Sequence, residues 1–423
     1  MSRAAMADAV DIPTQWKIKE LKVVVDINPE SRDPTQTPLE KFFYVDIDAV
    51  ENGSGVISTV KELIGKDAPS RARRVVHTDD VIMSEIRPYL KAFALVPKKL
   101  NNQICSTGFA VLRSKGEIDP QYLLNILFSN DVIDQCNRMM VGAQYPALND
   151  SQVKKIRIPL PPLSEQRSIA AIFHTVDDAI QRSRLAAAET EHLKAGVMQE
   201  LMMKGIGHTE FKMDEDVGKV PKGWEIKQLG EVCTVKTGPF GAQLHMSDYV
   251  EKGTPIITVE HLGDLGVIHE KLPLVSDADK ARLSEYLLKE GDIVFSRVGS
   301  VDRSCYISKK ESGWLFSGRL LRVRPATNEL LPSYLNNYFR FEGFKHRIRN
   351  ASVGGTMANL NTTIMNQIKI IFPPIYEQQK IADILSIIDR KLTLQRQRTA
   401  HYERLKQGLM NELLTGKRRV KVT

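Results

Sequence analysis

The residues best suited to chemistry in this sequence are cations and amides. Basic clusters include RARR at 71–74 and FKHRIR at 344–349. Lys and Arg neutralise phosphates, and Arg, Gln and Asn hydrogen bond to base edges. For any single arginine, a solvated surface charge is the simpler interpretation. With a net charge of +8, the clusters nevertheless favour a polyanionic partner, and DNA is the natural one.

Two loops at matching places carry further groups of this kind. They read VGAQYPALN at 141–149 and VGGTMANLN at 353–361. Their glycines let the backbone approach a phosphate closely, and nearby side chains would then reach bases. A plain turn before the next strand explains the loops equally well. The candidate DNA-contacting residues are Arg71, Arg73, Arg74, Arg87, Gln144, Tyr145, Lys236, Gln243, His245, Arg297, Arg303, Arg319, Arg349, Thr356 and Asn359.

Catalytic patterns are missing from the sequence. An adenine methyltransferase loop needs a polar residue before Pro-Pro and an aromatic one after it, but here the flanking residues are apolar: LPPL at 160–163 and FPPI at 372–375. No dinucleotide-binding glycine pattern, P-loop or G-x-S-x-G elbow occurs. The four cysteines and nine histidines lack metal-site spacing. We therefore expect no catalysis, no metal and no cofactor in the chain itself.

No run of about eighteen apolar residues occurs, and the first ten residues lack the apolar core of a signal peptide. We therefore expect a cytoplasmic protein with no membrane partner.

The elements that position these residues occur twice. LPPLSEQRSIAAIF at 160–173 and FPPIYEQQKIADIL at 372–385 lie 212 residues apart. The two loops above, PQYLLN with PSYLNN, and DDVIMSEI with GDIVFSRV share that offset, and PTQWKIKEL matches PKGWEIKQL 208 residues on. Collinear matches indicate a tandem duplication, with a period too long for a solenoid.

Each copy begins with an α+β part. The runs KFFYVDI, GFAVLR, TPIITVE, GDIVFS and RLLRVRP predict strands. The segments 120–140 and 332–348 predict helices. The segments that follow the double prolines match better between the two copies than the interiors of the α+β parts do. This is expected if those segments must stay alike to pair with each other, while the α+β parts read different sequences.

Each copy ends in a long helix that starts after the double proline. Ser164 is expected to cap the first of these arms, with Glu165 in its first turn. Heptad-like apolar positions predict a coiled coil of about 60 Å. They are Ile169, Phe173, Val176, Ile180, Leu193, Val197 and Leu201, then Ile381, Leu385, Ile388, Leu392, Leu405, Leu409 and Leu413. An arm could fold back on its own domain, but antiparallel pairing of the two arms is favoured.

The doubled P-P-x-x-E-Q phrase before a long helix resembles the specificity subunits of type I restriction–modification enzymes. STGFAVLR at 106–113, TGPFGAQLHMSDY at 237–249, GDIVFSRVG and LMNELLTGKRRV resemble them too. The resemblance covers residues 13–423 and implies two tandem-duplicated α+β target-recognition domains, separated by two helices packed as an antiparallel coiled coil with pseudo-two-fold symmetry. The expected boundaries are domain 1 at 1–160, arm 1 at 161–206, a linker at 207–220, domain 2 at 221–372 and arm 2 at 373–423.

The resemblance also implies a function. Each domain would read one half of a bipartite asymmetric site in double-stranded DNA, and the helices would set the spacer. The chain would bind two methyltransferase subunits, which carry S-adenosylmethionine, and restriction subunits that translocate and cut. Two alternatives remain open from the residues alone: an enzyme with its own methyltransferase or nuclease activity, and a coiled-coil adaptor that binds only protein.

Overall fold

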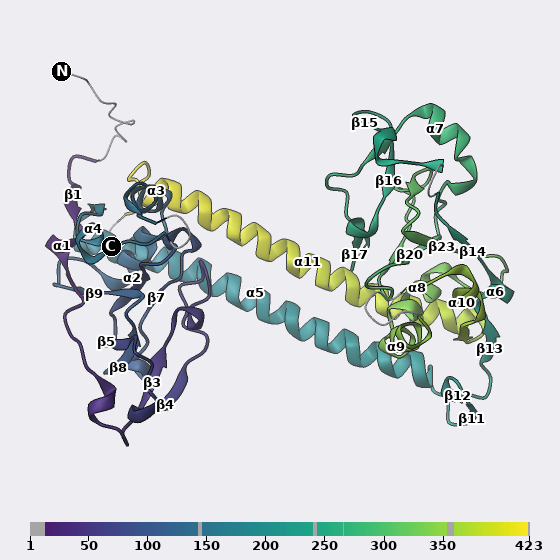
Figure 1. Ribbon diagram of the computed structural model, residues 1–423, viewed down its shortest axis with the longest axis horizontal. Coiled ribbons are helices and arrows are strands. Elements are labelled where there is room, and N and C mark those ends of the chain that lie inside the picture. Colours follow the sequence, from purple (N-terminus) through teal and green to yellow (C-terminus); the bar gives the residue numbers. More distant parts are fainter. Residues whose placement is uncertain (1–12, 143–145, 240–242, 265, 353–358, 422–423) are drawn as a thin grey trace. The chain divides into compact units, whose positions relative to one another are not determined.

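A computed structural model describes residues 13–142, 146–239, 243–264, 266–352 and 359–421. The chain divides into two compact units, Met1–Arg182 with Thr399–Thr423 and Ser183–Arg398. Each unit contains one α+β domain and a part of both long helices, α5 (Leu163–Lys204) and α11 (Ile375–Leu413) (Figure 1). The expected combination of two α+β domains and two long helices is therefore confirmed.

The first domain is built on two four-stranded sheets. One is antiparallel and contains, in order, β2 (Val25–Ile27), β9 (Phe109–Ser114), β6 (Val81–Ser84) and β7 (Phe93–Leu95). The other contains β4 (Lys61–Ile64), β3 (Lys41–Val45), β8 (Gln103–Ser106) and β5 (Ala72–Val76), with β3 and β8 parallel. A separate antiparallel pair joins β1 (Lys17–Glu20) to β10 (Arg157–Leu160), the strand that leads into α5.

The helices of the first domain are short. They are α1 (Leu21–Val24), α2 (Pro120–Leu127), α3 (Asn130–Met139) and α4 (Asp150–Val153). The segment predicted as helical at 120–140 is divided between α2 and α3. The division falls at Ser129, whose side chain accepts a hydrogen bond from the backbone N–H of Val132 and so caps α3.

The second domain repeats this plan. Its antiparallel sheet contains β14 (Cys233–Thr237), β23 (Leu320–Pro325), β20 (Ile293–Ser296) and β21 (Ser304–Tyr306). A parallel pair joins β16 (Thr254–Ile257) to β22 (Leu315–Phe316), and β13 (Glu225–Gln228) pairs with β24 (Lys369–Phe372) before α11. The matching helices are α6 (Leu229–Val232), α8 (Pro332–Arg340), α9 (Glu342–Ala351) and α10 (Thr362–Gln367). Equal strand orders confirm the duplication.

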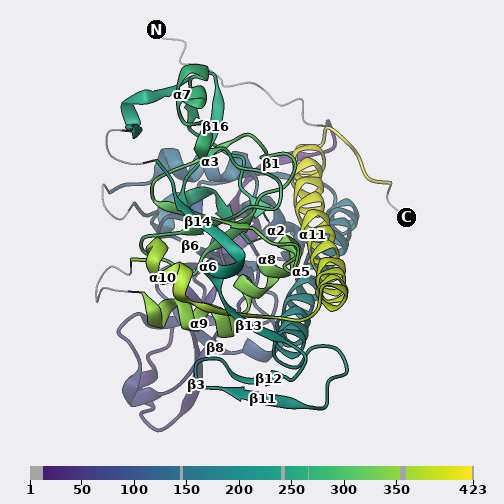
Figure 2. The same cartoon turned by 90° about the vertical axis from the view of Figure 1, so that its right-hand side faces the viewer.

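The second domain also has elements of its own. They are β15 (Tyr249–Val250), β17 (Leu262–Gly263), β18 (Gly266–Val267) and α7 (Asp277–Arg282). In contrast, β19 (Leu274–Val275) pairs antiparallel with β16 as β4 does with β3 in the first domain. The segment expected to be a linker holds a hairpin of β11 (Phe211–Asp214) and β12 (Gly218–Pro221) (Figure 2). The hairpin is fixed to the domain because Lys212 Nζ donates to the carbonyl of Trp224 at 2.6 Å.

The two long helices run antiparallel within each unit, and one ion pair recurs. In the first unit Lys406 Nζ lies 2.6 Å from Asp177 Oδ1. In the second, Lys194 pairs with Asp389. The residues of each ion pair match those of the other at the offset of 212. Pairing of the arms, rather than folding back of each on its own domain, is confirmed.

The heptad pattern fails at one position in the later part of each arm, while Val197, Leu201, Leu409 and Leu413 pack against the cores as predicted. Leu193 and Leu405 are 54% and 44% exposed, whereas Lys194, Met198 and Met202 are buried. An α-helix has 3.6 residues per turn, so the buried face moves away from a strict 3.5-residue repeat. The prediction that the apolar phase resumes at these two leucines was wrong.

The start of α5 is fixed by a buried carboxylate and has no serine cap. The helix begins at Leu163, so Ser164 lies inside its first turn and the predicted cap was wrong. Glu165 is 1% exposed and accepts a hydrogen bond from Trp16 Nε1 at 3.0 Å. Arg419, which follows α11, donates to the same carboxylate at 2.6 Å. We call this cluster the first arm lock.

The start of α11 has an equivalent second arm lock. Glu377 is 2% exposed and accepts from Trp224 Nε1 at 3.3 Å. His208, which follows α5, lies 3.0 Å from the same carboxylate, and the backbone N–H of Ile206 donates to it at 2.9 Å. In both units a buried glutamate at the start of one helix therefore binds the residues that end the other.

Within the described ranges, no helix combines the length and apolar character of a membrane span. The four cysteines are buried and unbridged, and burial raises the pKa of each thiol to about 12.

Candidate nucleic-acid interface

In the first domain, three chain segments meet beyond the end of β6. Residues 85–87 follow β6, residues 108–109 lead into β9, and residues 146–150 lead into α4. The N–H of Glu85 donates to the carbonyl of Gly108, and that of Leu148 donates to the carbonyl of Glu85, both at 2.9 Å. We call this meeting point the first junction.

The second domain has the same meeting point beyond the end of β20. The N–H of Arg297 donates to the carbonyl of Arg319, and that of Leu360 donates to the carbonyl of Arg297, both at 2.9 Å. An isolated β-bridge between Val298 and Asn359 matches the bridge between Ile86 and Ala147. The second junction therefore has the backbone of the first.

The side chains on these equal backbones differ in charge. The matched pairs, first domain first, are Glu85 with Arg297, Gly108 with Arg319, Ala147 with Asn359 and Asp150 with Thr362. The first junction thus presents two carboxylates where the second presents a guanidinium and a hydroxyl group. At the other two positions, Gly108 and Ala147 match the guanidinium of Arg319 and the amide of Asn359.

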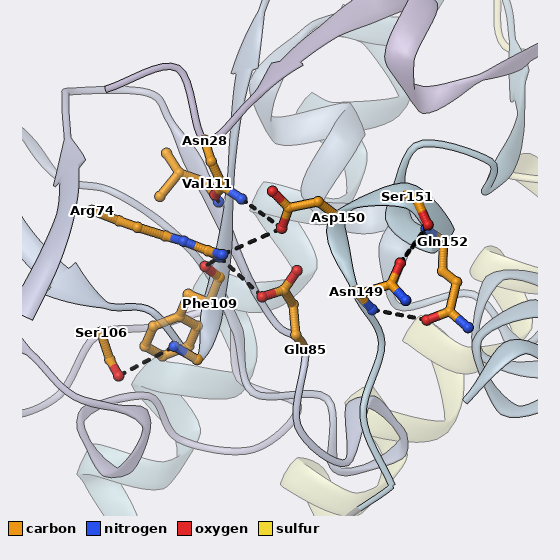
Figure 3. Close-up of polar contacts among 11 residues, drawn as sticks. Asn28, Arg74, Glu85, Ser106, Phe109, Val111, Asn149, Asp150, Ser151 and Gln152 are labelled. Atoms are coloured by element: carbon orange, nitrogen blue, oxygen red, sulfur yellow. Dashed lines mark hydrogen bonds and ion pairs between the residues drawn. The ribbon is translucent and has the colours of Figure 1, made fainter. Parts of the chain in front are cut away.

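The first junction contains a hydrogen-bonded charge network (Figure 3). Arg74 Nη1 donates to Glu85 Oε2 at 3.0 Å, and Arg74 Nη2 lies 3.3 Å from Asp150 Oδ1. Asn28 Nδ2 donates to the same Asp150 oxygen at 3.0 Å, and its own Oδ1 accepts from the N–H of Val111. The network fixes the carboxylate of Asp150, the first residue of α4.

Glu85 is the buried member of this network, with a side chain 8% exposed. Burial raises the pKa of its carboxyl to about 7, against the opposing effect of Arg74, and the nearby Asp150 carboxylate raises it further. Asp150, in contrast, has a side chain 48% exposed. The junction therefore combines an inner carboxyl that titrates near neutrality with an outer carboxylate accessible to a ligand.

The model of one protein family matches both halves of the chain. This family is described as the type I restriction modification DNA specificity domain, and the matches cover residues 13–190 and 221–404. The chain belongs to this family. Each match contains one α+β domain, one junction and most of the helix that follows.

Relatives in the specificity-domain family extend over most of the chain. The type I restriction enzyme MjaVIII specificity subunit of Methanocaldococcus jannaschii is 27% identical over 285 residues, which are 66% of each chain. The putative MjaX specificity subunit of that organism is 25% identical over 97% of this chain and 95% of its own. A solved structure described as concerning complex assembly and conformational transition of the type I R-M system contains a chain with a TM-score of 0.61 and 28% identity. It covers 96% of this chain and 100% of its own.

The junctions of this family member bring together five of the residues predicted from sequence. Arg74 and Arg87 lie at the first, and Arg297, Arg319 and Asn359 at the second. Arg87 has a φ of +47°, in the left-handed region, where the matching residue is Gly299 with a φ of +77°. The first domain thus keeps the arginine side chain in a backbone conformation that glycine, the residue of the second domain, adopts more easily.

Several other predicted residues hold structure outside the junctions. Arg73 lies 3.4 Å from Asp33, and Lys236 lies 2.6 Å from Glu285. Arg349 pairs with Asp302 at 2.7 Å and also with Glu342. Arg303 donates to the carbonyl of Leu262, and the side chain of Gln243 accepts from the hydroxyl of Tyr286 at 3.1 Å. Their proposed contact with DNA stays a prediction.

Two predicted residues, Arg71 and His245, are exposed. Gln144, Tyr145 and Thr356 lie outside the described residues. Within the described ranges, no group of three or more His, Cys, Asp or Glu side chains could hold a metal ion.

Sequence reasoning missed Asn28, Glu85 and Asp150. A signal for Glu85 was present, because the alignment of DDVIMSEI with GDIVFSRV places it opposite Arg297. A charge reversal within an otherwise similar segment marks a position whose side chain the shared fold does not constrain. Asn28 gave no such signal, since its role depends on its distance from Asp150 in the fold.

Proposed function

We propose that this specificity subunit reads a bipartite asymmetric DNA site, with one α+β domain on each half. The observation that carries the proposal is the match of one DNA-specificity family model to both halves of the chain. The junctions support it, because they combine one backbone with two different sets of side chains. Such modules suit the reading of two different sequences, since base edges are told apart by their pattern of donors and acceptors.

The two long helices set the length of the unspecified gap and bind two methyltransferase subunits. Support comes from the exposed apolar side chains along them, including Leu193, Ile387 and Leu394, which are 54%, 58% and 65% exposed. Apolar groups left in water favour burial by a partner. The restriction subunits, which translocate and cut, complete the assembly.

The chain itself contributes recognition and no catalysis. S-adenosylmethionine is bound by the methyltransferase subunits, and the chain needs no cofactor of its own. The proposal places the protein in the cytoplasm, where it meets double-stranded DNA.

The test is to purify the chain from its native cell with whatever accompanies it and to map methylated adenines on DNA treated with that complex. A motif of two specified blocks around an unspecified gap of fixed length is expected. An uninterrupted motif, or no methylation despite a co-purified methyltransferase, would contradict the proposal. The purified chain alone should bind this site in a salt-sensitive way and transfer no methyl group.

A further inference from the structure

The two junctions differ in the hydrogen-bonding groups that they offer to solvent. At the first, the half-exposed Asp150 has its Oδ1 occupied by Asn28 and Arg74. The Glu85 carboxyl also hydrogen bonds to the Asp150 carboxylate, while Asp150 Oδ2 accepts from no N–H donor among the described residues. The first junction therefore offers a pre-positioned acceptor, whose orientation is fixed by the neutral amide of Asn28 and the cationic guanidinium of Arg74.

The second junction offers a donor at another position, the one that matches Gly108 of the first. Arg319 is exposed, and its guanidinium has no hydrogen bond or ion pair with any residue in the described part of the chain. Its backbone is held by the N–H of Arg297. Thr362, which matches Asp150, carries no charge. The second junction thus lacks the carboxylate and gains a guanidinium.

Base edges in the major groove distinguish these two kinds of group. A carboxylate accepts from the exocyclic amino group of cytosine, and adenine carries a similar amino group. A guanidinium donates two hydrogen bonds to O6 and N7 of guanine and meets no acceptor pair of this kind on the other bases. An acceptor and a donor on equal backbones would therefore select different bases.

We propose that Asp150 and Arg319 are specificity-determining residues of the two domains. Asp150 reads a cytosine or an adenine in the block recognised by residues 13–160, and Arg319 reads a guanine in the block recognised by residues 221–372. The inference rests on the proposed function and adds to it the residue and the class of base in each half-site.

The order of burial in the first domain supports the assignment. Glu85 and Arg74 are too buried to reach a base, with side chains 8% and 15% exposed. They act as positioning residues for Asp150. This layering is the arrangement that a rigid recognition group needs, because a supporting shell fixes its geometry before the ligand binds.

The test uses the complete methyltransferase complex and a DNA library in which each position of both blocks is varied. Asp150→Asn should lower discrimination at one cytosine or adenine position of one block roughly ten-fold or more. Arg319→Gln should do the same at one guanine position of the other block. All remaining positions should keep their wild-type discrimination.

Matched controls are Asp131→Asn and Arg282→Gln, which change an exposed carboxylate on α3 and an exposed guanidinium on α7. Neither residue lies at a junction, and neither variant should change the motif. If Asp150→Asn prevents assembly, Asp150→Thr introduces the residue that the second domain already has at this position, and it should give the same loss of discrimination.

The outcomes separate the two proposals. If the wild-type complex methylates a split motif and the Asp150 and Arg319 variants both keep it unchanged, this inference is wrong while the proposed function stands. If the variants reduce methylation equally at all sequences, the two residues contact no base edge and the inference is also wrong. A wild-type motif without two blocks would overturn the proposed function itself.

Discussion

The arm locks and the junctions are both built twice, yet they have diverged to different degrees. Each lock has a buried glutamate, a tryptophan indole and a basic side chain from the chain that ends the other helix. The two junctions share their backbone hydrogen bonds, but the second has Arg297 where the first has Glu85, and Thr362 where the first has Asp150. The contrast indicates that the chain conserves side chains where its helices must pair and varies them where a ligand would bind.

The locks differ in one component, since the first uses Arg419 and the second His208. Arginine stays charged at all relevant pH values, whereas histidine is charged only when protonated. The partner glutamates are equally buried, so the buried carboxylate is the part that both locks require.

The largest expected effect comes from breaking a lock. Glu165→Ala removes the acceptor of Trp16 and the partner of Arg419, and should lower the free energy of unfolding by about 4 kcal/mol. Chemical denaturation followed by tryptophan fluorescence measures it. Glu117→Ala is the control, because Glu117 forms an exposed pair with Lys19, and the loss of such a pair should change the free energy of unfolding very little. Equal losses in the two variants would contradict the role of the lock.

A pH-dependent effect is expected at the first junction. The folded-state pKa of Glu85 is about 7, above its ordinary value of 4.5. The stability that this group contributes is therefore complete below about pH 4.5 and is lost as the pH rises to 7, by about 3 kcal/mol. The side chain introduced by Glu85→Gln does not titrate. The free energy of unfolding of the variant, relative to that of the wild type, should therefore rise by that amount between pH 4.5 and 8.

Denaturation curves at pH 4.5, 6 and 8 measure the difference for Glu85→Gln. A difference that is independent of pH would show that Glu85 has an ordinary pKa. The second domain has Arg297 at this position, so Arg297→Gln serves as the control and should show no such dependence over this range.

A smaller effect is expected where α5 ends. Gly205 has a φ of +67°, and a Cβ there would lie 2.6 Å from Glu377 Oε1 and 2.7 Å from the Trp224 ring. Gly205→Ala should therefore cost about 2 kcal/mol. Gly207→Ala shares the positive φ, at +74°, but has no atom within 4 Å, and should cost about 1 kcal/mol. The difference between the two melting curves gives the cost of disturbing the second arm lock. Equal costs for the two variants would contradict the close packing of Gly205 against that lock.

The smallest effect has the opposite sign. Arg87→Gly removes a side chain from a left-handed backbone, so it should raise the free energy of unfolding by about 0.5 kcal/mol. If the side chain serves recognition, DNA affinity should fall nonetheless. Lys271→Gly relieves a similar backbone, with a φ of +54°, and should leave affinity unchanged. Equal affinity in both variants would remove Arg87 from the interface.

The sequence predicted those features that repeat with a period. The duplication and the pairing of the arms follow from spacing, the strands from KFFYVDI to RLLRVRP follow from short apolar runs, and the structure confirms them. The failures have a common physical origin. Burial of Lys194 in place of Leu193 depends on the ion pair with Asp389, and the lock at Glu165 depends on Trp16 and Arg419.

The junction network was hidden from sequence for the same reason. Arg74 in RARR looks like a solvent-exposed cation, but it lies between Glu85 and Asp150 because β5 pairs with β8 and carries an irregularity between Ala72 and Arg74. Partners that are distant in sequence and differ between the two copies leave no periodic signal. Recognition residues are expected to be of this kind.

The most direct test of two separately reading domains is to replace residues 13–160 with a second copy of residues 221–372 and to map adenine methylation by the resulting complex. The copied segment brings Trp224 to the place of Trp16, so the first arm lock can form. The account predicts a motif in which the block read by residues 221–372 occurs twice and the other block is lost. A motif identical to that of the wild type, or one in which both blocks change, would contradict it.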